Sequence, residues 1–167
     1  MYASFDLKGP NALLFGRGGA GGVLNRVTKK GVLDGDFLHI GASVDTFGAG
    51  SVKLDRNFPL TQKTALRLNT FAESLDNHRD FFDGDRFGIN PALKVSVSEK
   101  TVLDLSYEYL DHERFIDRGI VTGSNGKPVE AFDEIVFGDP SQNVSTLDAH
   151  LVRGLLQHRF SANTKLN

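Results

Sequence analysis

A glycine-rich segment near the start of the chain has the residue spacing of a dinucleotide-binding loop. Residues 16–21 read G-R-G-G-A-G and match G-x-G-x-x-G after a short apolar run. That pattern binds a pyrophosphate only where the glycines open a helix that leads to a parallel strand. Residues 22–30 contain two valines and a threonine but no helical apolar stripe. The sequence therefore argues against a dinucleotide site, and no Lys-Ser or Lys-Thr follows the glycines to make a P-loop.

The other residue types that catalyse reactions or bind metals form no recognisable site in the sequence. The five histidines lack the spacing of a zinc site, and the chain has no cysteine. Residues 78–80 read H-R-D, as in a kinase catalytic loop, but no D-F-G accompanies them. Asp80, Asp83 and Asp85 lack the glutamate of an EF-hand calcium loop, so a polar loop is the better interpretation. We expect no enzyme activity, no cofactor and no bound metal.

Composition and charge argue against two further classes of protein. No stretch approaches the roughly 18 uncharged apolar residues of a transmembrane helix, whereas a transmembrane β-barrel, whose strands alternate, stays compatible with this composition. The net charge is −2 and the basic residues are scattered, so nucleic-acid binding is not indicated. The first ten residues lack the basic and apolar regions of a secretory signal. We expect either a cytoplasmic protein or a protein whose true start precedes this sequence.

Period-two alternation predicts six β-strands beyond the glycine-rich segment. We expect them at residues 38–44, 51–55, 64–73, 86–97, 103–109 and about 147–160. In the first five, one face carries no charge, and the other carries charges in mid-strand: Lys53, Arg67, Lys94, Asp104 and Glu108. The sixth strand has apolar residues on both faces, which predicts a β-bulge or a covered inner face.

The predicted connections alternate between short turns and long polar loops. Residues 59–63 and 98–100 are short turns, residues 76–84 and 113–145 are long loops, and parity places the short link at 46–48 at the long-loop end. A transmembrane barrel shows this pattern, and it keeps charges off its lipid face because an Arg or Lys there costs about 2 to 4 kcal/mol at the midplane. A soluble antiparallel sheet also alternates, but no helix that would cover its apolar face is evident.

Several short motifs in and after the glycine-rich segment occur at fixed offsets. Residues 7–10 read L-K-G-P, residues 14–18 read L-F-G-R-G, and residues 21–30 read G-G-V-L-N-R-V-T-K-K. This series resembles the end of the plug domain of TonB-dependent outer-membrane receptors. Downstream, the chain resembles the early barrel of the siderophore-receptor branch at residues 58–60, 65–68, 89–93, 117–119 and 137–140.

The resemblance implies a mainly β fold in which residues 1–31 are the C-terminal part of a plug domain and residues 32–167 are the N-terminal strands of an antiparallel transmembrane β-barrel. It implies transport of ferric siderophores across a Gram-negative outer membrane. The implied partners are the siderophore, outer-membrane lipid and the TonB energy-coupling protein, whose binding box is not in this sequence. About six strands cannot close a 22-stranded barrel, so we expect a fragment that does not transport alone. The alternative is a soluble antiparallel β-sheet module that binds a ligand or carbohydrate.

The resemblance also places a contact between plug and barrel at Gly16, Arg17, Gly18, Gly21 and Gly22. Glycines suit a segment packed inside a lumen because they allow positive φ and close backbone approach. Arg17 is implied to make polar contacts with the barrel wall, and the alternative is an exposed loop arginine.

Four further cations near the glycines, Lys8, Arg26, Lys29 and Lys30, are most simply interpreted as solvated charges. Tyr107 and Tyr109 fall on the apolar face of the fifth predicted strand. We favour an aromatic girdle at a membrane interface for these tyrosines over ordinary cross-strand packing.

Overall fold

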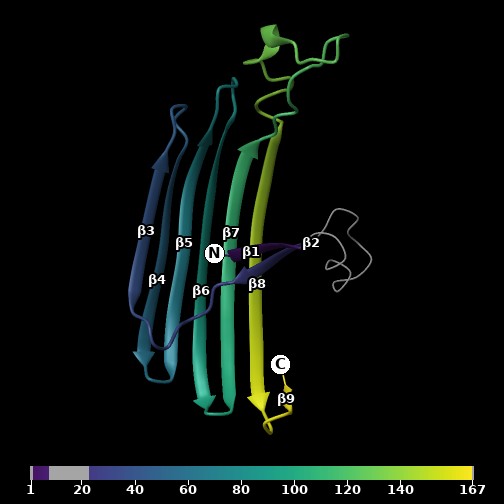
Figure 1. Ribbon diagram of the computed structural model, residues 1–167. Helices are drawn as coiled ribbons and strands as arrows, with labels where there is room; N and C mark the ends of the chain where they lie inside the picture. Colours follow the sequence, from purple (N-terminus) through teal and green to yellow (C-terminus); the bar gives the residue numbers. More distant parts are fainter. Residues whose placement is uncertain (1, 8–22, 167) are drawn as a thin grey trace.

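The protein is built almost entirely from antiparallel strands. This computed structural model describes residues 2–7 and 23–166. β1 (Tyr2–Leu7) and β2 (Val23–Thr28) form a two-stranded sheet. A seven-stranded sheet follows: β3 (Phe37–Val44), β4 (Gly50–Thr61), β5 (Thr64–Asp76), β6 (Asp83–Ser98), β7 (Thr101–Phe115), β8 (Val144–Arg159) and β9 (Lys165–Leu166). Each strand of this sheet pairs with its neighbours in the chain (Figure 1).

The predicted mainly antiparallel fold is confirmed, with all six predicted strands present as β3 to β8. Most are longer than the alternation indicated, since β4 runs on to Thr61 and β7 to Phe115. These extensions were missed because Arg56 and Asp111 put charges on the apolar face and interrupt the pattern. The only helical element in the described residues is the 3-10 turn η2 (Glu130–Phe132), and no described helix is long and apolar enough to cross a membrane.

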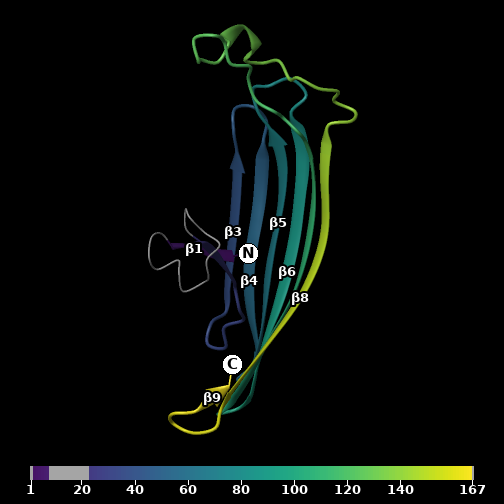
Figure 2. The ribbon, with the colours of Figure 1, turned by 90° about the vertical axis from the view of Figure 1, so that its right-hand side faces the viewer.

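The large sheet has one polar and one apolar face. Residues 29–35, which we call the junction segment, contact only one of them, through Asp55, Asn57, Arg67 and Asp104. We call this the inner face and the opposite side the outer face. Figure 2 shows β1 to one side of the sheet, whose long strands are bowed.

The outer face is apolar and exposed. Ile40, Val52 and Leu105 expose 65%, 55% and 41% of their surface, respectively, and no described segment packs over them. The soluble-module alternative required two sheets whose apolar faces meet. In the described residues the small sheet instead lies on the inner side, where Thr28 at the end of β2 accepts a hydrogen bond from Arg153 of β8 at 3.4 Å.

Pro91 lies in the middle of β6, where a central strand normally excludes proline because its nitrogen has no hydrogen to donate. The pairing of β6 with β7 is interrupted between Ile89 and Ala92. There the side-chain amide of Asn90 donates to the carbonyl of Tyr107 at 2.7 Å, and Asn90 is completely buried. The asparagine therefore supplies a donor to the partner strand at the position where proline cannot.

The prediction of a bulge in the sixth strand is wrong. β7 and β8 pair in unbroken register from Thr101 with His158 to Phe115 with Val144. A covered inner face is not found either, because most residues of β8 are exposed on both faces. The apolar residues on both faces are explained by an open edge: β8 pairs beyond β7 only at His158 and Arg159, with β9. Within residues 23–166, the far edge of β3 has no strand beside it.

The connections gather at two ends of the sheet, as their lengths predicted. The loops of residues 77–82 and 116–143 lie at the same end as the short link of residues 45–49, and the tight turns at 62–63 and 99–100 lie at the other (Figure 1). We call these the long-loop end and the short-turn end.

Candidate functional site

The inner face carries a network of paired charges in place of an apolar core. Lys53 of β4 and Arg86 of β6 both bind Glu73 of β5, the lysine at 3.1 Å, and Arg153 of β8 binds Glu108 of β7 at 2.9 Å. Alternation along the strands places all of these side chains on one side. The five charges predicted for the polar face, including Lys53 and Glu108, are therefore all on the inner face.

The first contact between the junction segment and the sheet is centred on Asp55. Arg67 of β5 donates to both carboxylate oxygens of Asp55, Nε to Oδ1 and Nη2 to Oδ2, each at 2.7 Å. Lys29 reaches the same carboxylate from the junction segment, with Nζ 2.8 Å from Oδ2. Arg67 also donates to the backbone oxygen of Lys30 at 3.2 Å and lies over the ring of Phe37. Two cations from different parts of the chain thus share one carboxylate.

The second contact repeats this arrangement at Asp104 of β7. Lys30 of the junction segment lies 2.8 Å from Oδ2, and Lys94 of β6 lies 3.4 Å from Oδ1. Asp104 is 8% exposed, so both cations bind a nearly buried charge. The interpretation of Lys29 and Lys30 as solvated charges is incomplete: their side chains keep 34% and 42% of their surface exposed, but each is also bound to a carboxylate of the sheet that alternation alone does not reveal.

Hydrogen bonds from a side chain of β4 to the backbone of the junction segment, and close packing against β5, also fix this segment. The side chain of Asn57, which is completely buried, accepts from the amide of Val32 at 3.0 Å and donates to the carbonyls of Val32, at 2.8 Å, and Gly35. Gly31 lies so close to β5 that an added Cβ would be 2.8 Å from the carbonyl oxygen of Ala65. A residue without a side chain is required at this crossing.

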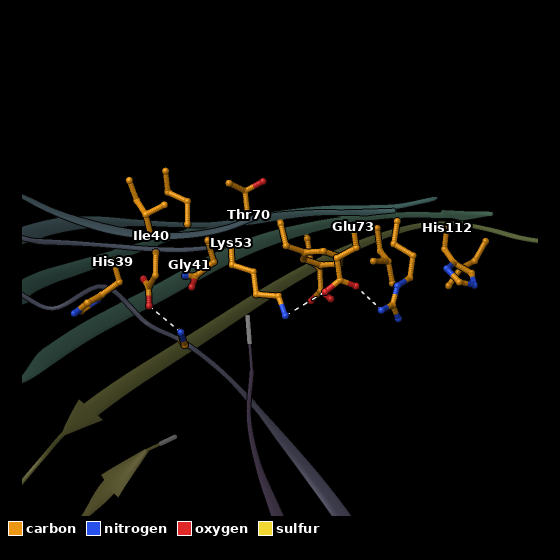
Figure 3. A pocket seen from close by; sticks show the side chains of 16 residues that line it. His39, Ile40, Gly41, Lys53, Thr70, Glu73 and His112 are labelled. Atoms are coloured by element: carbon orange, nitrogen blue, oxygen red, sulfur yellow. Dashed lines mark hydrogen bonds and ion pairs between the residues drawn. The ribbon is translucent and has the colours of Figure 1, made fainter. Parts of the chain in front are cut away.

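Toward the long-loop end, the inner face leaves a cavity of about 800 Å³. Its lining includes His39, Lys53, Glu73 and His112 of the sheet and Lys29 of the junction segment. Figure 3 shows Lys53, Glu73 and His112 on one side of the sheet and Ile40 and Thr70 on the other. Dashed lines in Figure 3 mark the ion pairs among these lining residues, including Lys53 with Glu73.

The predicted plug contacts at Gly16, Arg17, Gly18, Gly21 and Gly22 lie outside the described residues, as does Lys8. The side chain of Arg26 is also outside them. Within residues 2–7 and 23–166, no three histidine, aspartate or glutamate side chains gather into a group that could hold a metal ion. The structure shows the junction segment contacting the sheet through residues that were not predicted to make this contact: Lys29, Lys30, Gly31, Asp55 and Asn57.

A signal for two of these residues was present in the sequence. Asp55 and Asn57 follow Lys53 at period two and so share its polar face if the strand continues past residue 55. Extending the strand through Arg56 would have brought Asn57 onto that face. The sequence does not indicate which carboxylates Lys29 and Lys30 bind, because the pairing residues are far apart in the chain: Lys30 and Asp104 are separated by 74 residues.

The outer face is free of charge within the first five predicted strand ranges; the extensions add charges beyond them, and Asp148 lies within the sixth range. Arg56 lies on this face, ion-paired with Asp36 and 4.5 Å from the ring centroid of Phe58. At the long-loop end, Asp111 and Asp148 face each other across β7 and β8. The apolar positions thus form a band with a charge on either side.

Tyr107 and Tyr109 lie on the outer face next to this long-loop boundary. The Tyr107 hydroxyl is 2.7 Å from Nδ1 of His150, and the ring of Tyr109 lies 4.8 Å from the same imidazole. His150 in turn lies 3.1 Å from Asp148. The tyrosines therefore join the apolar band to a polar cluster, as residues at an interface between lipid and water do.

Comparisons with known proteins give one group of relatives. No family model matches the chain. The metal-pseudopaline receptor CntO of Pseudomonas aeruginosa is 30% identical over 165 residues, which are 96% of this chain and 23% of CntO. The probable TonB-dependent receptor BfrD of Bordetella pertussis is 34% identical over 116 residues, 68% of this chain and 16% of BfrD. The chain thus spans about a quarter or less of the length of these relatives.

Solved structures agree on the fold. The closed form of the ferric-catecholate import receptor Fiu from E. coli superimposes with a TM-score of 0.78 at 22% identity, covering 95% of this chain and 24% of Fiu. The receptor FpvAI, in its complex with pyocin S2, gives a TM-score of 0.79 at 19% identity over 93% of this chain and 22% of that chain.

Proposed function

Since the chain is a homologue of the TonB-dependent receptors, we propose that it works as part of an outer-membrane receptor that imports metal chelates, with ferric siderophores as the substrate class. In this proposal residues 1–31 are the end of the plug and residues 32–167 are the first strands of the barrel. Transport is by binding and rearrangement, without bond-making chemistry. The energy-coupling protein and the remaining barrel strands are partners that this segment needs.

The observation that carries the proposal is the segregation of the two faces of the large sheet. On β7 the outer-face positions from Thr101 to Tyr109 are uncharged, and Asp111 follows. A strand of roughly 9 to 11 residues crosses a tilted bilayer path, so this band has the length that a membrane requires. The charged inner face binds the junction segment, as a lumen wall binds a plug. In water the same exposed band and the open edges of β3 and β8 would promote aggregation.

The relatives support the substrate class. CntO is by name a metal-pseudopaline receptor, Fiu is a ferric-catecholate import receptor, and PiuA of Acinetobacter baumannii, 24% identical over 164 residues, is a probable siderophore receptor. All three names denote receptors, and none denotes an enzyme.

Orientation in the membrane can be tested with two single cysteines, because the chain contains none. In cells expressing the gene that encodes this chain, Ser124→Cys at the long-loop end should react with a membrane-impermeant maleimide. Lys100→Cys at the short-turn end is the matched control and should react only after the outer membrane is opened. Labelling of both sites in intact cells, or of neither after opening, contradicts the proposed orientation.

Transport is tested by uptake of radioactive iron. A strain lacking the gene should lose uptake of one class among ferric catecholates, ferric hydroxamates and ferric α-hydroxycarboxylates, and the restored gene should return it. Expression of residues 1–167 alone should not restore uptake. Equal uptake of all three chelate classes with and without the gene would refute the proposed substrate class.

A further inference from the structure

One arginine organises the long-loop end. Arg79, in the loop between β5 and β6, is 6% exposed although every element around it is a surface loop. Its Nε lies 2.7 Å from the carboxylate of Asp117, near the start of the long loop between β7 and β8. Its two terminal nitrogens donate to the carbonyls of Asp133 at 3.0 Å, Gly119 at 3.2 Å and Ile135 at 2.7 Å.

These four oxygen atoms come from widely separated points of a single loop. Gly119 follows β7, whereas Asp133 and Ile135 lie near the middle of residues 116–143, just after the 3-10 turn η2. The guanidinium group presents several donors in a fixed plane, so donating to three carbonyls while pairing with Asp117 requires one loop conformation. Arg79 thus fixes both the beginning and the middle of the loop.

The neighbours of Arg79 strengthen the same connection. The amide of Asp80 donates to the carbonyl of Glu134 at 2.7 Å, and His78 lies 3.5 Å from the carboxylate of Asp133. The ring of His78 is 6.1 Å from that of Phe47 in the link between β3 and β4. Phe81 has a φ of +61°, a conformation that bulky residues rarely adopt and that surrounding contacts must hold in place. Three connections at the long-loop end therefore meet around residues 78–81.

We propose that Arg79 is a positioning residue that holds the loop of residues 116–143 in the conformation that binds the transported chelate. The inference rests on the proposed function, because it takes the long-loop end as the ligand-facing surface. Arg79 itself is buried and acts through the loop, not by touching the ligand. A loop that adopts its binding conformation only part of the time lowers the apparent affinity by that fraction.

The test uses the full receptor in the outer membrane, with Ser124→Cys carrying a nitroxide spin label at the turn of residues 123–127. Arg79→Gln removes the charge and most of the donors while keeping a similar size. We expect faster motion of the label, about a tenfold higher half-saturating concentration of the ferric chelate, and an unchanged maximal uptake rate per receptor. Arg118→Gln, an exposed charge in the same loop, is the matched control and should leave both readouts at the parent values.

Arg79→Lys keeps the ion pair with Asp117 but cannot reproduce the planar fork, so intermediate values are expected in both readouts. If Arg79→Gln does not reach the membrane, Arg79→Lys replaces it as the test. The inference is then overturned if the label motion and the half-saturating concentration of Arg79→Lys both equal those of the parent receptor. Unchanged label motion in Arg79→Gln overturns the positioning role. Faster motion with an unchanged half-saturating concentration overturns the link to ligand binding.

Failure of the proposed function is recognised separately. If the parent receptor takes up none of the ferric chelates, that function is refuted, and with it the ligand-binding role of the loop. The label motion still shows whether Arg79 fixes the loop.

Discussion

At the junction segment two carboxylates each bind two cations, whereas at the long-loop end a single cation binds four oxygen atoms. Asp55 and Asp104 each have one cation from the sheet, Arg67 or Lys94, and one lysine from the junction segment. Among the described residues no second cation is ion-paired with Asp117, and Arg79 alone joins this carboxylate to the three carbonyls.

This difference determines what a single substitution does. If one junction lysine is lost, the carboxylate stays neutralised by the sheet, so a buried charge is not left unpaired. If Arg79 is lost, three carbonyls lose a donor and the Asp117 carboxylate, whose side chain is 17% exposed, loses its counter-ion at the same time. Removing one partner of a buried ion pair costs much more than removing an exposed one. The junction segment should therefore tolerate the loss of one cation, whereas the long loop should not tolerate the loss of Arg79.

The largest effect is expected for Arg79→Met, which keeps volume but removes every donor. We expect the free energy for opening the loop of residues 116–143 to fall by about 3 kcal/mol, because three carbonyls lose their donors and Asp117, which keeps its hydrogen bond from the Gly119 amide, loses its counter-ion. Hydrogen exchange of the loop amides measures this. Arg118→Met is the control, and equal exchange in the two variants would show that Arg79 is not the point on which the loop depends.

The next prediction tests whether the junction segment, like the long loop, depends strongly on a single side chain, that of Asn57. Asn57→Ala removes three hydrogen bonds and leaves the backbone groups of Val32 and Gly35 without their partner. We expect the opening free energy of the junction segment to fall by about 2 kcal/mol, again read by hydrogen exchange. Asn163→Ala, an exposed asparagine near β9, should change it by no more than about 0.5 kcal/mol.

Close packing at the junction gives a smaller effect. In Gly31→Ala the new Cβ would meet the carbonyl oxygen of Ala65 and the Cβ of Lys94, so the segment must shift outward. Overpacking of this kind costs about 1 to 2 kcal/mol. Gly41→Ala is a matched control, because nothing lies within 4 Å of its added Cβ. Equal exchange rates in both variants would mean that the segment is not tightly held.

The shared-carboxylate arrangement predicts that single lysine substitutions are mild. Lys30→Gln should cost less than about 1 kcal/mol, because its side chain is partly exposed and Lys94 still neutralises Asp104. Lys30→Gln with Lys94→Gln should cost more than the sum of the two single changes, since Asp104 is then left without either cation. Additive values in this double-mutant cycle would contradict the redundancy.

The smallest effect concerns a carboxylate with purely local partners. Hydrogen bonds from the Ser141 hydroxyl, then the Ser141 backbone amide, lower the pKa of Asp139 below its usual value. A lowered folded-state pKa stabilises this turn above the ordinary aspartate pKa of about 3.9, and that contribution is lost as the pH falls through the folded value. An NMR titration should show the pKa rising toward the ordinary value in Ser141→Ala. A pKa that does not move would assign the lowering to another cause.

Alternation predicted which face each strand residue occupies, and it did so correctly for Lys53, Arg67, Lys94, Asp104 and Glu108. It underestimated strand length wherever a paired charge such as Arg56 sits on the apolar face. Alternation could not predict which residues pair across the sheet, because a period of two assigns each side chain to a face of the sheet and does not identify its neighbours. The carboxylate partners of Lys29 and Lys30 were therefore missed.

Arg79 was hidden for a related reason. Its local sequence, H-R-D, drew a comparison with a catalytic loop, whereas its role comes from the carbonyls of a loop 40 to 56 residues away. Backbone acceptors leave no trace in side-chain types, so only the fold reveals them.

The neighbour-to-neighbour order of the large sheet has a consequence for its assembly. Every interface from β3 to β8 joins consecutive strands, so each can form as a hairpin without waiting for a distant part of the chain. Four of these five hairpins close through connections of no more than six residues, and only β7 with β8 must close across residues 116–143. Loop-closure entropy grows slowly with length, by about 0.6 kcal/mol per doubling. We expect this sheet to form one hairpin at a time, with the pairing of β8 to β7 as the slowest step among β3 to β8.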